Sequence, residues 1–326
     1  MISRRSLRAG QFWAVSLLAS FGLGAQAIEL RLAEIHPTDH PTAKADYEFA
    51  RLVGERSGGR IHISVYPDSV LGQEVAVLEQ LQFGAIDIAR VSLSAMALSV
   101  PRLDALQMPY LYRDEEHMWK VLKGEIGRSL LASVSEAGFV GLGWYEAGAR
   151  SVYNARRPVR IPSDMRGLRI RVQEGRLMAD TMAAFGAIPV PQAFGETYSA
   201  LETAAVDGAE NNASTYYTSR HYQIARYYSL TEHARIPEII VGSAVSFATL
   251  APADRDLIAK AAMDSSDFQR GAWASYERVA NERLRQAGVH FVELADLSAW
   301  RALVQTIYER QSPEIKAIVA KIRALR

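Results

Sequence analysis

The chain has 326 residues, of which 49% are apolar and 22% charged, with a formal net charge of +1 and no cysteine. This composition is typical of a globular protein long enough for two domains of ordinary size. It excludes disulfides, thiol nucleophiles and cysteine-based metal sites, and the balanced charge gives no indication of a nucleic-acid partner.

The N-terminal segment has the features of an export signal. The basic start MISRRSLRAG precedes the apolar run QFWAVSLLASFGLG, and the tripeptide AQA that follows fits an A-x-A cleavage site. We predict a signal peptide over residues 1–27 and therefore an exported protein. The paired arginines fit a twin-arginine signal and an ordinary secretory signal equally well, and an uncleaved anchor is a further alternative. No later segment approaches the roughly 18 continuous apolar residues of a membrane span.

Apolar periodicity predicts strands and helices in alternation near the start of the remaining chain. Residues 28–33, 61–66 and 86–91 have the character of strands, whereas residues 42–57 and 73–83 have the periodicity of amphipathic helices that end at glycines. This βαβαβ order predicts a mostly parallel sheet with helices on its faces.

The rest of the chain continues as a mixture of strands and helices. The predicted strands are residues 139–145, 168–173, 239–247 and 289–293. The chain is mainly helical from Pro252 onward, and the predicted helices are residues 176–185, 193–206, 269–286 and, apart from a break near Pro313, 297–325. This rhythm fits two α/β lobes joined by crossover strands, with a ligand cleft between them, but it also fits a single large α/β domain.

No enzyme motif is present. The seven histidines form no HExxH or similar metal spacing, and the GxSxG, P-loop and GxGxxG patterns are absent. His36 and His40 are four residues apart, but Pro37 and Pro41 oppose a helix there. We therefore predict no metal, no cofactor and no catalysis, although a Ser-His-Asp triad assembled from distant positions stays open.

Two arginines alternate with apolar residues in LRIRVQEG, residues 168–175. Arg169 and Arg171 share one face of the predicted strand, and Arg150 follows the segment GLGWYEAGA. A guanidinium offers a planar fork that fits a carboxylate with two parallel hydrogen bonds, so two converging arginines would hold an organic acid in a closed cleft. Most arginines are surface residues, and the sequence alone does not decide between these interpretations.

The stretch DGAENN, residues 207–212, combines a turn-forming glycine with asparagines that can donate and accept hydrogen bonds to hydroxyls. Tyr216, Tyr217 and Tyr222 follow it. One interpretation is a platform for the apolar face of a sugar; the other is a turn that caps the next helix, with the tyrosines packed in the core.

Several spaced segments resemble the solute-binding subunits of TRAP (tripartite ATP-independent periplasmic) transporters, the DctP-like family. In order, they are HPTDHPTAKA, RSGGRIHISVYPDSVLGQEVAVLEQLQFGAIDIARVS, LDALQMPYLYRDEEHMWKV, GLGWYEAGARSVYNARRPV, MRGLRIRVQEG, FGAIPVPQAFGETYSALETAAVDGAENN and YYSLTEH. The resemblance implies a type II periplasmic binding protein with two α/β lobes, a hinge and an interlobe ligand cleft. Lobe I would comprise residues 28–149 with about 239–278, and lobe II residues 150–238 with about 279–326.

The resemblance also implies a function and the residues that perform it. Such a protein captures an organic acid and delivers it to membrane permease subunits. Arg171 would pair with the carboxylate of the ligand, Arg150 would be the second arginine and Asn211 the cleft asparagine, whereas Arg169 would lie further from the cleft. The other residues expected to line the pocket are His36, Glu74, Ser92, Gln173, Phe194 and Glu238.

The segments WYEAGARSVYN, DGAENN and YYSLTEH resemble members associated with hexuronates, so D-glucuronate or D-galacturonate is the expected ligand. A uronate offers one carboxylate to the arginines and hydroxyls to Asn211, Glu74, Glu238 and His36. The segment RVQEGRLMAD departs from such members at residues 174–176, which leaves a C4-dicarboxylate, sialic acid or a 2-oxo acid as alternatives. A periplasmic sugar-acid enzyme that uses Glu74 or Glu210 with a histidine, and a ligand-sensing receptor subunit, are alternatives of other classes. We expect a monomer.

Overall fold

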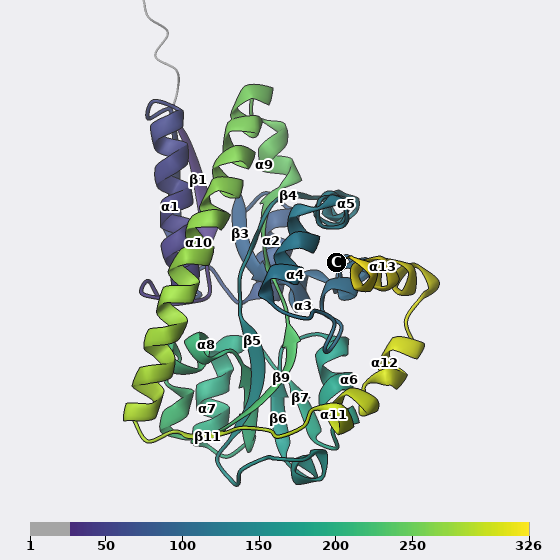
Figure 1. The fold of residues 1–326 in the computed structure, drawn as a ribbon. Helices are drawn as coiled ribbons and strands as arrows, with labels where there is room; N and C mark the ends of the chain where they lie inside the picture. The colour runs from purple at the N-terminus through teal and green to yellow at the C-terminus, as the bar shows by residue number, and fades with distance from the viewer. Residues whose placement is uncertain (1–26, 326) are drawn as a thin grey trace, which may run out of the picture.

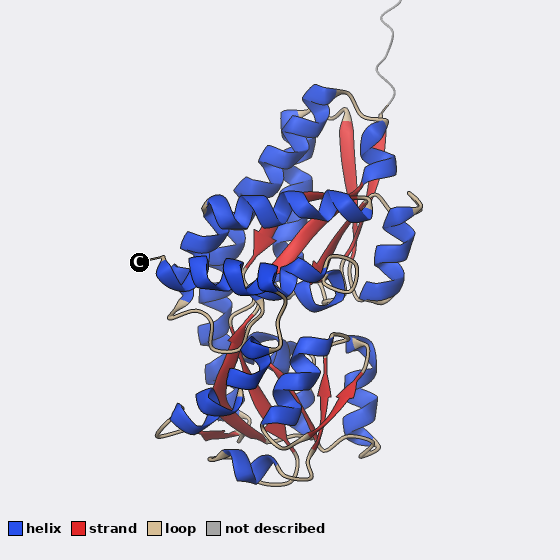
Figure 2. Ribbon diagram, turned by 90° about the vertical axis from the view of Figure 1, so that its right-hand side faces the viewer, coloured by secondary structure: helices blue, strands red, loops and turns tan. Residues whose placement is uncertain are grey.

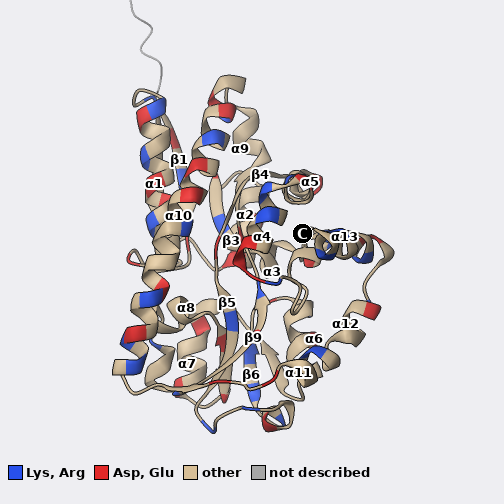
Figure 3. Cartoon of the chain, in the orientation of Figure 1, with Lys and Arg blue, Asp and Glu red and all other residues tan. Residues whose placement is uncertain are grey.

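The computed structural model describes residues 27–325 of the chain, so the predicted signal peptide lies outside the described residues except for its last residue. Two lobes, each built on its own mixed β-sheet, lie one above the other (Figures 1 and 2). Within the described part of the chain, no helix has the length and apolar character needed to cross a membrane. Charged side chains of both signs are interspersed along the outer helices of the upper lobe (Figure 3).

The sheet of the first lobe has five strands. In spatial order they are β2 (Ile61–Tyr66), β1 (Ile28–Ala33), β3 (Ile88–Ser92), β10 (Glu238–Ser243) and β4 (Phe139–Tyr145). Strands β1, β2 and β3 are parallel, as the βαβαβ order predicts, with α1 (Pro41–Arg56) and α2 (Glu74–Gln82) as the connecting helices. Strand β10 is antiparallel to both neighbours, because it enters this sheet from the second lobe.

The sheet of the second lobe has six strands. In spatial order they are β11 (His290–Val292), β9 (Tyr227–Arg235), β5 (Ala149–Asn154), β8 (Gly208–Asn211), β6 (Arg169–Val172) and β7 (Ile188–Pro191). Strand β6 is parallel to β7 and β8, whereas β5 is antiparallel to β8 and β9. Strand β4 is antiparallel to β10 and so runs in the same direction as β1, β2 and β3, which confirms the prediction of a mostly parallel sheet for the first lobe. In each sheet one strand runs against the others, β10 in the first lobe and β5 in the second, and each of these strands crosses from the other lobe.

The remaining helical segments cover the faces and edges of the two sheets. In chain order they are α3 (Leu93–Met96), η1 (Pro101–Leu106), α4 (Glu115–Lys123), α5 (Glu125–Ser133), η2 (Val134–Ala137), η3 (Pro162–Met165), α6 (Arg176–Ala184), η4 (Phe194–Glu196), α7 (Thr197–Glu202), α8 (Ala213–Thr218), η5 (His221–Gln223), α9 (Ala244–Ala248), α10 (Pro252–Gln286), α11 (Ser298–Leu303), α12 (Gln305–Glu309) and α13 (Pro313–Ala324).

The chain crosses between the lobes at the β4–β5 and β9–β10 connections, along α10, and again between α12 and α13. Helix α10 has 35 residues and packs against α1 in the first lobe and α8 in the second (Figure 1). The predicted helix over 269–286 is the second half of this element. Two short connections and one long shared helix are suited to a hinge, because few backbone torsions must change for the lobes to move.

The C-terminal helix α13 returns to the first lobe, where it packs against η1. Ile315, Val319 and Ile322 form its buried stripe, and His117 Nε2 lies 2.9 Å from the carbonyl oxygen of Ile322. The sequence-based division placed residues 279–326 in lobe II, so this placement of α13 differs from it. The amphipathic stripe shows that the helix needs an apolar surface, but it does not show which lobe supplies it.

Two predicted elements end earlier than expected. The strand predicted over 239–247 stops at Ser243, because the hydroxyl of Ser243 accepts from the backbone N–H of Ser246 and begins α9. The helix predicted over 193–206 is a short 3-10 turn followed by α7, and the chain leaves α7 through Ala204 at φ 53°.

Candidate functional site

The first lobe presents one edge of its sheet to the second lobe. His36 follows β1, Ser92 ends β3, and Glu238 begins the antiparallel strand β10 in register with Ser92. Glu74 reaches the same edge from the first residue of α2, where the helix dipole favours a carboxylate. The carboxyl ends of parallel strands are where open α/β sheets bind ligands, and these four side chains gather there.

The second lobe faces this edge with the corresponding edge of its own sheet. Arg171 lies in β6, and Asn211 ends the neighbouring parallel strand β8. Arg150 lies near the start of β5, which runs antiparallel to β8 and pairs Ser151 with Asn211. Phe194 follows β7 in the 3-10 turn η4. The two arginines predicted to hold a carboxylate therefore come from adjacent regions of one sheet.

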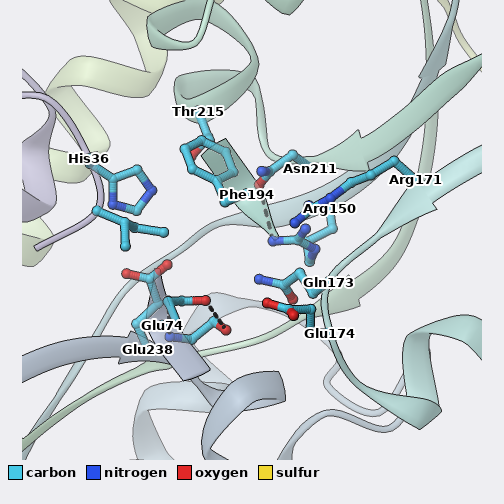
Figure 4. Close-up of a pocket in the computed structure, with 12 residues that line it drawn as sticks. His36, Glu74, Arg150, Arg171, Gln173, Glu174, Phe194, Asn211, Thr215 and Glu238 are labelled. Carbon is cyan, nitrogen blue, oxygen red and sulfur yellow. Dashed lines mark hydrogen bonds between the residues drawn. The ribbon is translucent and has the colours of Figure 1, made fainter. Parts of the chain in front are cut away.

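A small cavity lies between these two edges (Figure 4). It is lined by all nine residues expected from the sequence, which are His36, Glu74, Ser92, Arg150, Arg171, Gln173, Phe194, Asn211 and Glu238. Ile35, Glu174 and Thr215 also line it. Because the lining comes from both lobes, the cavity exists only while the lobes are together.

Arg171 carries a buried charge for which the described residues supply no carboxylate. The residue is 2% exposed, and its Nε and Nη2 donate to the backbone carbonyl of Gln192 at 2.9 and 2.5 Å. Burial lowers the pKa of its guanidinium from the usual value. The ring centre of Phe194 lies 6.0 Å from its guanidinium carbon. A buried charge is costly unless it is paired, so this position favours the arrival of an anion.

Arg150, in contrast, already has a counter-ion. Its Nε and Nη2 donate to the carboxylate of Glu210 at 2.6 and 2.8 Å, and its Nη1 donates to Asn211 Oδ1 at 3.0 Å. Burial raises the pKa of Glu210, but Arg150 and His233 together bring it down to about 2. Nη2 also donates to the Glu210 carbonyl, so four of the five guanidinium N–H groups are used and one remains for a ligand.

Arg169 has different surroundings from Arg171, although both lie in β6. Its side chain is 39% exposed, and its Nε lies 3.1 Å from Oδ2 of Asp207. Hydrogen bonds from Arg169 hold the pKa of the Asp207 carboxyl well below its usual range. Arg171 lines the cavity, whereas Arg169 forms a surface ion pair outside it.

In the first lobe, three carboxylates surround the buried Arg90. Arg90 Nε donates to Glu34 at 2.7 Å, its Nη2 pairs with the same carboxylate, and its Nη1 lies 3.3 Å from Glu74 and 3.2 Å from Glu238. Glu74 also accepts from the backbone N–H and the hydroxyl of Ser92 at 2.6 and 2.8 Å. Burial raises the pKa of Glu34, but Arg90 holds it well below its usual range. This network fixes the wall that Glu74 and Glu238 form.

His36 and His40 form a stacked pair of rings. Their centroids are 3.9 Å apart, and their planes differ by 5°. His36 Nδ1 lies 2.8 Å from Glu34, whereas His40 Nδ1 accepts from the backbone N–H of Thr42 at the start of α1. His40 Nε2 lies 3.3 Å from the hydroxyl of Thr215 in the other lobe. In the part of the chain that the structure describes, no group of three or more His, Asp or Glu side chains is arranged to hold a metal ion.

Hydrogen bonds between the lobes characterise this arrangement as closed. The hydroxyl of Ser94 in the first lobe donates to Gln173 in the second at 3.0 Å. The backbone N–H of Gly195 in the second lobe donates to Gln73 in the first at 3.2 Å. Gln173 lines the cavity, and Gln73 and Gly195 are next in sequence to the lining residues Glu74 and Phe194, so both bonds require the lobes to be in contact beside the cavity.

Sequence reasoning missed the residues that organise the site from behind. Arg90 interrupts the apolar strand IDIARVS, and a charge within such a strand is the local signal that indicates a buried ion pair. Glu210 was considered only as an enzyme acid, whereas the structure makes it the counter-ion of Arg150. No local pattern marks Thr215 as a lining residue, because its position depends on how the lobes meet.

Comparison with known proteins gives consistent matches over nearly the whole chain. The model of a family described as bacterial extracellular solute-binding protein, family 7, matches residues 32–314. A solute-binding protein of Chromohalobacter salexigens is 35% identical over 97% of this chain and 95% of its own length. A TRAP periplasmic solute-binding protein of a Bradyrhizobium species, solved in complex with α/β-D-galacturonate, is 37% identical with a TM-score of 0.89, covering 90% of this chain and 99% of that one. A Chromohalobacter salexigens TRAP protein solved with bound D-glucuronate is 35% identical with a TM-score of 0.88, covering 91% and 100%.

Proposed function

We propose that this chain, which belongs to the bacterial extracellular solute-binding proteins of family 7, binds a hexuronate, D-glucuronate or D-galacturonate. Members of this family bind solutes for TRAP transporters and are not enzymes. The resemblance to TRAP subunits noted in the sequence is thereby confirmed. Proteins of this family are periplasmic, bind small organic acids and act with membrane permease subunits.

The observation that carries the proposal is the unpaired charge of Arg171. Its guanidinium is held by the Gln192 carbonyl at the wall of a cavity between the lobes. A ligand carboxylate supplies the missing counter-ion, and a charge-assisted pair in a site closed to water is among the strongest polar contacts available. Arg150 contributes its remaining N–H while it stays bound to Glu210.

The remaining lining suits a ring that carries hydroxyls. Asn211 uses its Oδ1 for Arg150 and for the backbone of Asn212, and within the described residues its amide NH₂ has no partner. Glu74 and Glu238 offer acceptors on the opposite wall, and Phe194 offers an apolar face (Figure 4). One carboxylate and several hydroxyls on a six-membered ring match this distribution of donors and acceptors.

Transport follows from the closed arrangement of the two lobes. A ligand that contacts both walls stabilises the closed form relative to the open one, since those contacts exist only when the lobes meet. We propose that a permease recognises this closed form and that residues 1–27 direct export by the secretory or the twin-arginine route. We also propose that the protein acts as a monomer and has no nucleic-acid partner.

The test is a thermal-shift screen of the protein comprising residues 28–326, stripped of ligand by unfolding and refolding. The panel contains hexuronates, aldonates, sialic acid, C4-dicarboxylates and 2-oxo acids. A ligand that binds only the folded state raises the melting temperature, so D-glucuronate or D-galacturonate should give the largest shift. A shift with dicarboxylates or 2-oxo acids alone would contradict the hexuronate, and no shift with any acid would contradict the site.

A further inference from the structure

The two walls of the cavity carry different charged groups. Arg171 and Arg150 lie on the side of the second lobe, and Glu74 and Glu238 lie on the side of the first (Figure 4). On the arginine side, Glu210 neutralises Arg150. Glu174 lines the cavity from the same lobe, but within the described residues it forms no ion pair with Arg171, whose charge is left for the ligand. The glutamate side therefore determines what the other end of a bound acid must be.

One buried guanidinium serves all the carboxylates on the first-lobe side. Arg90 and Glu34 have fully buried side chains, and Glu34 takes two of the N–H groups of Arg90. Glu74 and Glu238 share the third nitrogen, Nη1, at 3.3 and 3.2 Å. Three carboxylates thus surround one guanidinium, and Arg90 has no freedom to turn toward a ligand.

The two carboxylates that line the cavity from the first lobe differ in how far they are satisfied. Both oxygens of Glu74 accept hydrogen bonds from Ser92. Oε2 of Glu238 lies near Arg90 but outside hydrogen-bond geometry, and within residues 27–325 it has no hydrogen-bond partner. A buried acceptor without a partner favours a donor, and a ligand hydroxyl is such a donor.

We propose that Glu74 and Glu238 are specificity-determining residues that restrict the site to acids with a single carboxylate and a hydroxyl-bearing far end. A hydroxyl placed against this wall donates to a carboxylate. A second carboxylate placed there has no proton to donate and meets like charges in a site closed to water, where repulsion is strong. This inference rests on the proposed function and deepens it, because it excludes dicarboxylates by a stated physical cause.

The test compares two open-chain acids that differ in one end group, D-galactonate and galactarate, together with D-galacturonate. Each is titrated calorimetrically, or by displacement of D-galacturonate, into the wild-type protein and into the Glu74→Gln/Glu238→Gln double variant. Glutamine keeps the size of each side chain and removes its charge, and an amide nitrogen at Glu74 Oε2 can donate to the Ser92 hydroxyl. Glu79→Gln, on the exposed side of α2, is the matched control for the loss of a charge on the same lobe.

We expect the wild type to bind galactarate at least about a hundredfold more weakly than D-galactonate, the factor that corresponds to about 3 kcal/mol. In the double variant this ratio should shrink at least about tenfold, and in Glu79→Gln it should not change. A folded double variant with the wild-type ratio would overturn the inference, as would a wild type that prefers any dicarboxylate. A wild type that binds only another monocarboxylate and excludes the dicarboxylate would refute the proposal that the ligand is a hexuronate. The same result would support the inference that Glu74 and Glu238 exclude a second carboxylate.

Discussion

Replacement of Arg171 by methionine separates a binding role from a structural one. Methionine keeps most of the apolar stem and removes the guanidinium, so packing against Phe194 is largely retained. In the ligand-free protein two effects oppose each other. The Gln192 carbonyl loses two hydrogen bonds, but a buried charge without a carboxylate partner is removed. We therefore expect the melting temperature of the ligand-free variant to change little.

Ligand affinity should respond very differently. Truncation of one partner of a buried, hydrogen-bonded charge pair weakens binding by about 2–5 kcal/mol, because the other charge is left buried and unpaired. That range is roughly a 30- to 5,000-fold increase in Kd. Isothermal titration with D-glucuronate and D-galacturonate measures it, and circular dichroism verifies the fold.

The neighbouring arginine of the same strand is the matched control. Arg169→Met removes the same group from β6, but from a side chain that is 39% exposed and already paired with Asp207. We expect its Kd to stay within about twofold of the wild type, because an exposed pair contributes only about 0–1 kcal/mol and lies outside the cavity. A folded Arg171→Met protein with near-native affinity, or an equal loss in Arg169→Met, would refute the reasoning.

Three further predictions concern the hinge, the Arg150 pair and closure. Burial raises the pKa of Glu146, which lies between β4 and β5, to about 7. The folded state therefore binds this proton more tightly than the unfolded state, and the free energy of unfolding should fall by about 3 kcal/mol as the pH rises from about 4.5 to 7. Glu146→Gln should flatten that part of the profile of melting temperature against pH, and an equally steep profile would contradict the assignment. Glu210→Gln should lower the free energy of unfolding by about 3–5 kcal/mol in urea titrations, because Arg150 loses its counter-ion, and a wild-type midpoint would count against the pair. Gln73→Ala removes a hydrogen bond with Gly195 that exists only in the closed form. The Kd for the ligand should therefore rise by up to about tenfold, while the stability of the ligand-free protein stays unchanged. An unchanged Kd would show that this bond does not stabilise closure.

Regular parts of the first lobe were predictable because local signals agree there. Strands β1 and β2 alternate, and α1 begins after a proline-flanked cap and ends at paired glycines. Strand β8, GAEN, escaped prediction because it is buried while carrying a charged residue, Glu210, whose partner is 60 positions away in the sequence. Its pattern is that of a polar turn, and only the neighbouring strand makes it a strand.

The candidate site, like the fold, has parts that were predictable from the sequence and parts that were not. Arg169 and Arg171 are equivalent in a period-two pattern, and only the distant residues Asp207 and Gln192 distinguish their surroundings. The resemblance to a family singled out Arg171, whereas the residue pattern left the question open. The charged wall around Arg90 could not be anticipated from local sequence, because its carboxylates come from three separate segments that meet at one sheet edge.

The most direct test of the account is a crystal structure of the protein with D-glucuronate or D-galacturonate bound. We expect the ligand carboxylate within hydrogen-bond distance of Arg171 Nη1, and ring hydroxyls directed at Glu74 and Glu238. A carboxylate placed elsewhere in the cleft, with Arg171 bonded only to the Gln192 carbonyl, would contradict the central claim.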